Sequence, residues 1–167
     1  MFFSIDPGYR GEKGKVQTQY QNLIDSDDDF ADGFYIPENV YIIGTMNDID
    51  RSVESMDFAM RRRFAFVEVT AEESAENMNL SDESRRRMKA INDEIKQIDG
   101  LNKSYFIGGA YFLKVDNPED GEEGLSYDEL WNYHLEGLIR EYLRGIMASD
   151  EIENKLSLIK SAYEKAE

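Results

Sequence analysis

The sequence contains no cysteine and one histidine, His134. Without cysteine the chain cannot form a disulfide or a thiolate metal site. A single histidine leaves no redundancy for a Ser-His-Asp triad or a histidine-based metal site. We therefore expect no metal site in this chain, and the lack of cysteine is typical of a cytoplasmic protein.

Long apolar runs are also missing. No stretch approaches the roughly 20 apolar residues that a membrane span needs. The apolar start, Met1-Phe2-Phe3-Ser4, lacks the charged residues and the length of a signal peptide. We therefore expect no membrane partner.

Positive charge is scarce: 19 basic residues face 35 acidic ones, for a net charge of -16. Duplex DNA binding depends on Lys and Arg that neutralise phosphates, and here these residues gather in two short islands, 61–63 and 85–89. A broad nucleic-acid surface is therefore disfavoured. The 167 residues are 41% hydrophobic, which is enough to bury a sizeable core.

Residues 41–69 hold the most informative pattern of the chain. The apolar runs 40–44 and 64–69 predict two buried strands, and a helix is expected between them over about 50–62. This order predicts a βαβ unit in a parallel sheet, with residues 15–24 as an edge strand. Because α/β sheets bind ligands at the carboxyl ends of their strands and clustered arginine binds phosphate, the segment indicates nucleotide chemistry.

From about residue 70 the pattern becomes helical. Apolar residues recur at spacings of three and four, and Ser81 or Asp82 can cap the first long helix. Helices are predicted over about 81–98, 127–147 and 150–166. The chain is therefore expected to contain an α/β domain over residues 1–70 and a mainly helical domain over 71–167.

Asn47 follows the first predicted strand. Its amide can both donate and accept hydrogen bonds without changing charge, as the positioning of a hydrolytic water beside a phosphate requires. The alternative is that Asn47 and Asp50 cap a turn or the next helix. The spacing alone favours neither interpretation.

Arg61, Arg62 and Arg63 stand at the end of the predicted helix. Arginine is favourable there because of the helix dipole, so a solvated stabilising cluster is one interpretation. The other is an arginine finger that reaches a phosphate bound by a neighbouring subunit. Composition alone favours the first. The second basic island, at 85–87 beside Asp82 and Glu83, is interpreted as a solvated helix face.

The order of these residues resembles the signature of the McrB-type AAA+ NTPases, the motor subunits of modified-cytosine-dependent restriction systems. The resemblance rests on Tyr-Ile-Ile-Gly-Thr-Met-Asn at 41–47, Asp-Arg-Ser at 50–52 and Asp-Phe-Ala-Met-Arg-Arg-Arg-Phe at 57–64. Here Asp48-Ile49 stands where the family has Thr-Ala, and Met60 where it has Leu. Apart from that threonine, the polar and charged members of the motif are retained.

Weaker similarity extends in both directions. The segment Arg10-Gly11-Glu12 resembles one that follows the Walker B helix in this family. Residues 107–112, Ile-Gly-Gly-Ala-Tyr-Phe, resemble an Ile-Gly-His-Ser-Tyr-Phe segment of the helical lid. Gly109 replaces the family's histidine, which places a polar role at that point in doubt.

By this resemblance Asn47 occupies the sensor 1 position, and Asp50 and Arg51 complete the signature loop. Arg63 is the first candidate for the arginine finger and Arg62 the second. A structural role is expected for Asp57.

The phosphate-binding parts of a P-loop NTPase are missing. The glycine-dense segment 8–15 lacks the Gly-Lys-Ser/Thr ending of a Walker A loop, and no Walker B acid is found. The resemblance therefore implies the C-terminal part of an AAA+ module, beginning after Walker B, with an incomplete core and a helical lid. The intact protein would use GTP or ATP with Mg²⁺, whereas this chain alone should be inactive and bind neither nucleotide tightly.

The resemblance also implies partners. The intact protein would form a homo-oligomeric ring, expected to be a hexamer, with an McrC-like endonuclease subunit and DNA bound through a missing N-terminal domain. Two alternatives stay open: a non-catalytic AAA+-derived interaction or regulatory module, and a MoxR-like chaperone ATPase. The chaperone explains the pairing of Met-Asn with Asp-Arg-Ser less well.

Overall fold

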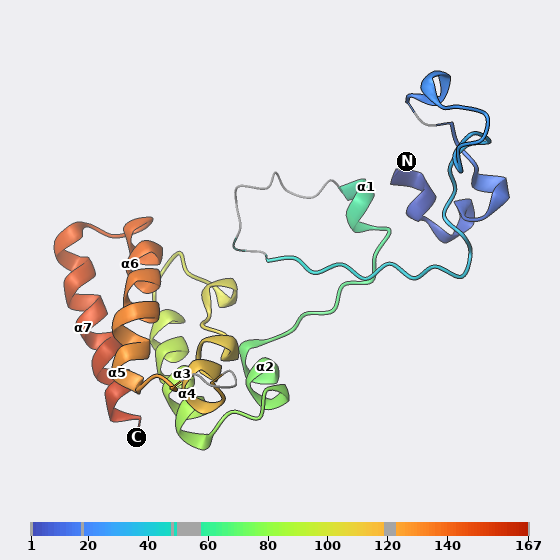
Figure 1. Ribbon diagram of the computed structural model, residues 1–167. Coiled ribbons are helices and arrows are strands. Elements are labelled where there is room, and N and C mark those ends of the chain that lie inside the picture. The colour runs from blue at the N-terminus through green and yellow to red at the C-terminus, as the bar shows by residue number, and fades with distance from the viewer. Residues whose placement is uncertain (1, 18, 48, 50–57, 119–122, 167) are drawn as a thin grey trace. The chain divides into compact units, whose positions relative to one another are not determined.

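A computed structural model describes residues 2–17, 19–47, 49, 58–118 and 123–166 (Figure 1). Its backbone contacts separate two units, Met1–Phe66 and Val67–Glu167. The sequence places the corresponding domain boundary after residue 70.

The first unit consists of turns and short helices. Its one α-helix among the described residues is α1, Phe58–Arg61, which coincides with the end of the helix predicted over about 50–62; the remainder of that prediction lies outside the described residues. A single antiparallel bridge joins Val16 to Phe34, with N···O distances of 2.9 and 2.8 Å. The 3-10 helices are Phe2–Ile5, Pro7–Tyr9, Glu12–Gly14 and Gln21–Leu23.

The predicted parallel sheet is wrong. Neither 40–44 nor 64–69 forms a strand, and the described residues of the predicted edge strand 15–24 hold only the Val16 bridge and turns, one of them a 3-10 turn. Tyr41 and Ile43 are 88% and 93% exposed, whereas a central strand is covered on both faces.

The physical reason is that a strand needs neighbours as well as apolar residues. Its backbone N–H and C=O groups must be paired along both edges. The residues that the structure describes supply no such ladder beside 40–44 or 64–69. An apolar run by itself therefore does not predict a strand. The structure gives no support for a partial P-loop core of parallel strands.

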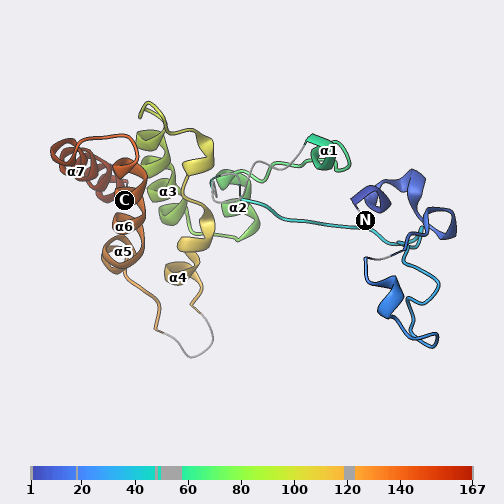
Figure 2. The ribbon, with the colours of Figure 1, turned by 90° about the horizontal axis from the view of Figure 1, so that it is seen from above.

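The second unit is helical, in agreement with the helical domain predicted for this part of the chain. Helices α3 and α7 lie side by side, and α6 packs against α7 (Figures 1 and 2). A π-helical turn, Trp131–Leu135, joins α5 to α6. The helices are α2 (Ala71–Asn77), α3 (Asp82–Ile95), α4 (Leu113–Asp116), α5 (Tyr127–Leu130), α6 (Glu136–Arg144) and α7 (Ser149–Lys165).

Local capping explains where α2, α3 and α5 begin. Ser81 caps α3, as its sequence predicts, by accepting a hydrogen bond from the Ser84 amide at 3.1 Å. Reciprocal capping boxes, each a Ser or Thr paired with a Glu three residues later, open α2 at Thr70 and α5 at Ser126. Each such cap stabilises its helix by about 1 kcal/mol.

The core of this unit forms between α3, the α5–α6 run and α7. Trp131 and Leu135, four residues apart in the π-helical turn, both face the interior, at 1% and 0% exposure. Trp131 packs on Tyr163 of α7 with ring centroids 5.3 Å apart. Other fully buried side chains are Ile91, Ile95, Ile107, Phe112, Leu130, Ile139, Leu143 and Ile159.

Candidate functional site

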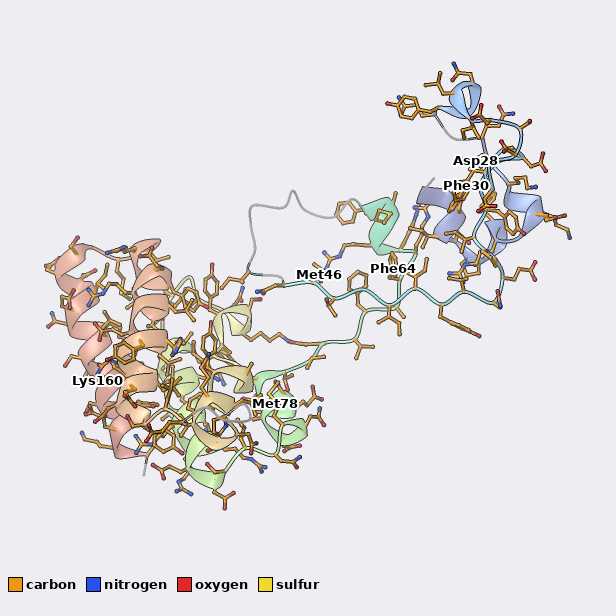
Figure 3. The ribbon with its side chains drawn as sticks, viewed as in Figure 1. Asp28, Phe30, Met46, Phe64, Met78 and Lys160 are labelled. Carbon is orange, nitrogen blue, oxygen red and sulfur yellow. The ribbon has the colours of Figure 1, made fainter. Side chains whose placement is uncertain are left out.

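Asn47 lies exposed at the end of the irregular segment 40–47, directly after Met46, which is labelled in Figure 3. Its side-chain oxygen accepts a hydrogen bond from the Ile49 amide at 3.3 Å, as in an Asx turn. In the described part of the chain no protein group accepts a hydrogen bond from its side-chain nitrogen. The side chain therefore caps a turn and also presents a donor to solvent.

The three arginines at the end of α1 differ in their surroundings. Arg61 lies over the Phe66 ring, 5.4 Å from its centroid. The Nη1 of Arg63 donates to the Ala59 carbonyl, and its Nε is buried without a hydrogen-bond partner. Arg62 is exposed, and no described residue makes a hydrogen bond or ion pair with its guanidinium. Arg62 is therefore the most available of the three to a group outside the chain.

Within the described part of the chain, the predicted site residues do not form one connected cluster. No hydrogen bond or ion pair links Asn47 to Arg62 or Arg63 within the described part of the chain. Asp50 and Arg51, and the structural candidate Asp57, lie outside the described residues.

The helical unit contains a buried cationic centre that the sequence did not predict. The interpretation of 85–87 as a solvated face is wrong for Arg87, which is 5% exposed. Its Nε and Nη2 donate to the Glu83 carboxylate at 2.9 and 2.7 Å, and its Nη1 donates to the Tyr163 carbonyl at 3.1 Å. Arg87 therefore binds the last turn of α7 to α3.

Two tyrosines enclose this arginine. The Arg87 guanidinium carbon lies 4.3 Å from the Tyr127 ring centroid and 5.0 Å from that of Tyr163. The Tyr163 hydroxyl donates to the Tyr127 carbonyl at 2.8 Å. Burial raises the pKa of Tyr163 above its ordinary value, with the Arg87 charge acting in the opposite direction. The phenol therefore stays neutral at physiological pH and acts as a hydrogen-bond donor.

Another tyrosine of the helical unit, Tyr142, is partly buried against the core. Burial, together with smaller contributions from nearby Tyr111 and Tyr105, raises the pKa of Tyr142 to about 12. The Tyr105 and Tyr142 rings meet edge to face, with centroids 5.1 Å apart. The distance and the raised pKa are those of packed core aromatics, not of a proton-transfer pair.

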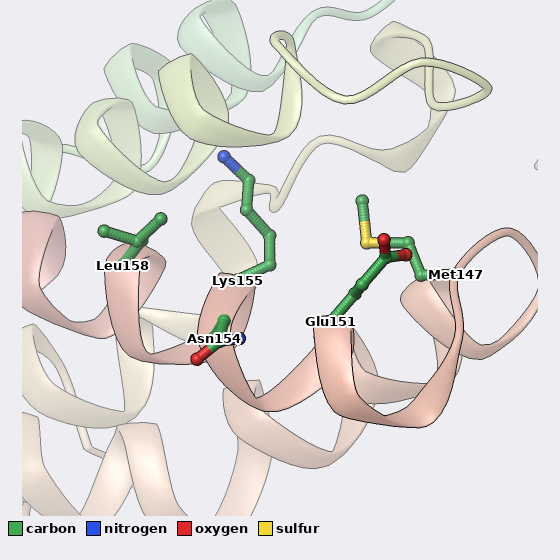
Figure 4. Close-up of a pocket in the computed structure, with 5 residues that line it drawn as sticks. All are labelled: Met147, Glu151, Asn154, Lys155 and Leu158. Carbon is green, nitrogen blue, oxygen red and sulfur yellow. The ribbon is translucent and has the colours of Figure 1, made fainter.

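Two open pockets lie in the described part of the helical unit. One, of about 330 Å³, lies along α7, where Lys155 extends toward Glu94 of α3 and pairs with it at 2.8 Å (Figure 4). Another, of about 490 Å³, lies beside the Arg87 centre. The first is lined by Met147, Glu151, Asn154, Lys155 and Leu158, and the second by Glu83, Arg87, Ser126, Tyr127, Asp128 and Glu164.

The described ranges of the chain offer neither a metal cluster nor a membrane-spanning helix. They contain no group of three or more His, Cys, Asp or Glu side chains placed to hold a metal ion. None of their helices has the length and apolar character needed to cross a membrane.

The segment 107–112 is held by a buried asparagine. Asn92, 3% exposed, donates to the Ile107 carbonyl at 3.0 Å and accepts from the Ile107 amide at 2.7 Å. Gly109 lies against α2, where an added Cβ would be 3.1 Å from the Ala75 Cα and 3.2 Å from the Leu80 side chain. This close approach explains why a glycine is favoured where the resembling family has histidine.

We expect Gly109→Ala to destabilise the helical unit by about 1–3 kcal/mol, because the α2 backbone must move to admit the methyl group. Gly108→Ala is the matched control, since its Cβ would meet no atom within 4 Å. Urea unfolding followed by circular dichroism measures both. Equal midpoints for the two variants would contradict the packing at Gly109.

Sequence comparison relates this chain to a known protein, which the geometry alone does not do. Over 134 residues the chain is 35% identical to the "Type IV methyl-directed restriction enzyme EcoKMcrB subunit" of Escherichia coli strain K12. The chain is similar to McrB. The match covers 73% of this chain and 27% of the relative, so the chain spans about a quarter of the relative's length.

The comparison supports the McrB-like relationship inferred from the signature over 41–64. It does not test the prediction that the chain corresponds to a C-terminal part, which stays a prediction. No family model matches the chain, and no solved structure does.

Proposed function

We propose that this chain is part of an AAA+ nucleoside triphosphatase that acts as the motor subunit of a DNA restriction system. The 35% identity to the McrB subunit over 134 residues carries the proposal. The retained signature supports it, since Asn47 and the arginines at 61–63 are the residue types that phosphoryl transfer requires. In this proposal the chain supplies sensor and finger residues, followed by a helical lid.

The roles of these residues follow from their chemistry. Asn47 orients the attacking water or the γ-phosphate through its free amide donor, and Arg62 or Arg63 stabilises the charge that develops in a neighbouring subunit's site. Asp50 and Arg51 act in the loop that follows Asn47. The active site is thus composite, with groups from two subunits.

GTP or ATP with Mg²⁺ would supply the reactive phosphate. The residues of this chain do not fit that group by themselves, because they include no Gly-Lys-Ser/Thr loop and their described part has no metal-binding cluster. No catalytic step is therefore assigned to the metal here.

We expect the isolated chain to release no phosphate from GTP or ATP. The test compares it with an McrB graft, in which this chain replaces the matched segment of the Escherichia coli relative and that protein supplies the remaining residues. The graft should hydrolyse one of the two nucleotides, and Asn47→Ala should abolish most of that turnover. Hydrolysis by the pure chain that Asn47→Ala removes would contradict the proposal, as would a folded, assembled graft without activity.

The proposed partners are further copies of the same protein in a hexameric ring, an McrC-like endonuclease subunit and DNA bound by another domain. The net charge of -16 supports the last assignment, since this chain has no broad basic surface for DNA. Light scattering of the graft with nucleotide present measures the ring directly.

A further inference from the structure

Arg10 joins two parts of the first unit that lie far apart in the sequence. Its Nε and Nη2 donate to the Ile5 carbonyl at 3.3 and 3.0 Å, and its Nη1 donates to the Val40 carbonyl at 2.5 Å. All three bonds go to backbone oxygens. The guanidinium geometry is needed to make them together, since a lysine ammonium cannot present a planar fork of donors.

The residues around Arg10 reinforce the same connection. The Gly11 amide donates to the Ile36 carbonyl at 2.8 Å, and the Val16–Phe34 bridge is a further backbone contact between the same two segments. Gly14 is required for the turn, since an added Cβ would lie 1.7 Å from the Tyr9 carbonyl oxygen. Residues 5–16 and 34–40 are thus bound through backbone groups.

Val40 begins the segment that ends at Asn47. Between these two residues, no hydrogen bond or ion pair to another described residue holds 41–46. The bond from Arg10 to Val40 is therefore the last tertiary hydrogen bond before Asn47. Without it the nearest fixed point moves back to Ile36, which lengthens the free segment and increases its conformational entropy.

We propose that Arg10 is a positioning residue that fixes the origin of the segment carrying Asn47. The proposal rests on the proposed function, in which Asn47 acts beside the γ-phosphate. Arg10 acts through Asn47 and not on the nucleotide; it narrows the range of positions that Asn47 can occupy. Its loss should therefore lower kcat more than it raises KM.

The first experiment uses the 167-residue chain and measures hydrogen exchange at the Gly11, Val16 and Phe34 amides. Arg10→Ala and Arg10→Lys should both reduce protection at Gly11, while the helical unit keeps its protection. Lys13→Ala is the matched control, an exposed cation in the same turn. Unchanged Gly11 protection in both Arg10 variants would overturn the anchor.

The second experiment measures steady-state hydrolysis by the McrB graft. Arg10→Ala and Arg10→Lys should lower kcat about 10-fold with KM within about 2-fold, as expected for lost orientation without lost binding. Millimolar guanidinium should partly restore Arg10→Ala and leave Lys13→Ala unchanged. Normal kcat in Arg10→Ala together with a defective Asn47→Ala would overturn the positioning role alone. Normal kcat in Asn47→Ala would instead refute the role of Asn47 in the proposed function.

Discussion

Replacing Arg62 by alanine is expected to lower nucleotide hydrolysis by the McrB graft about 10³-fold while nucleotide affinity stays within a few-fold, since arginine fingers act on the transition state. The resemblance ranks Arg63 first, but exposure favours Arg62. The Arg63 guanidinium is bonded to the Ala59 carbonyl, whereas no described residue engages that of Arg62. We therefore expect Arg63→Ala to have a smaller effect, mainly by loosening the turn after α1.

Mixed assemblies distinguish a finger from a residue of the subunit's own site. The Arg62→Ala graft is mixed with a graft whose Walker A lysine is replaced; each alone should be inactive. Because a finger acts on the neighbour's nucleotide, mixed rings should regain part of the activity. Arg61→Ala is the matched control, since Arg61 lies over Phe66. Failure of mixed rings to regain activity, or normal turnover by Arg62→Ala, would contradict the assignment.

The helical unit could be predicted from the sequence because its determinants are local. Ser81 caps α3, and the apolar residues of α3 recur at helical spacing and face the core of the unit. The predicted end of the last helix, near residue 166, likewise agrees with the observed end of α7 at Lys165. Caps and periodicity are read within a few residues, so no distant partner has to be known.

The predicted sheet failed for the opposite reason. The run at 40–44 is apolar enough for a central strand, yet strand formation depends on which segments lie beside it. Ile43 is 93% exposed in this structure, so the pattern identified an apolar segment and assigned it the wrong structure. The positions of Asp50 and Arg51 lie outside the described residues, so the signature loop stays a prediction.

Arg87 shows a third limit on what can be predicted from the sequence. Its neighbours Asp82 and Glu83 suggest an ordinary exposed ion pair along a helix. Its burial is decided by Tyr127 and Tyr163, which come from α5 and α7 and which no local pattern connects to α3. A buried arginine therefore looks like a surface arginine until the rings that enclose it are known.

Arg87→Ala is expected to destabilise the helical unit by about 2–3 kcal/mol, less than the loss of a fully buried charge pair costs, because the Glu83 side chain is 38% exposed. The change leaves the Tyr163 carbonyl without its 3.1 Å donor and opens a cavity between two aromatic rings. Urea unfolding of the isolated chain, followed by circular dichroism, gives the free energy of unfolding. The slope of the urea transition should be the same for the variant and the parent chain if the substitution leaves the surface exposed on unfolding unchanged.

Two further variants separate the contributions of this arginine. Arg87→Lys keeps the charge but loses the paired bonds to Glu83 and the planar contact with the rings, so it should recover less than half of the lost stability. Arg86→Ala is the matched control: Arg86 is exposed and donates to the Ala166 carbonyl at 3.2 Å, so its loss should cost about 1 kcal/mol or less. If Arg87→Ala unfolded at the same urea concentration as Arg86→Ala, the buried cation would be dispensable, and the packing of α7 on α3 would have to rest on the apolar contacts alone.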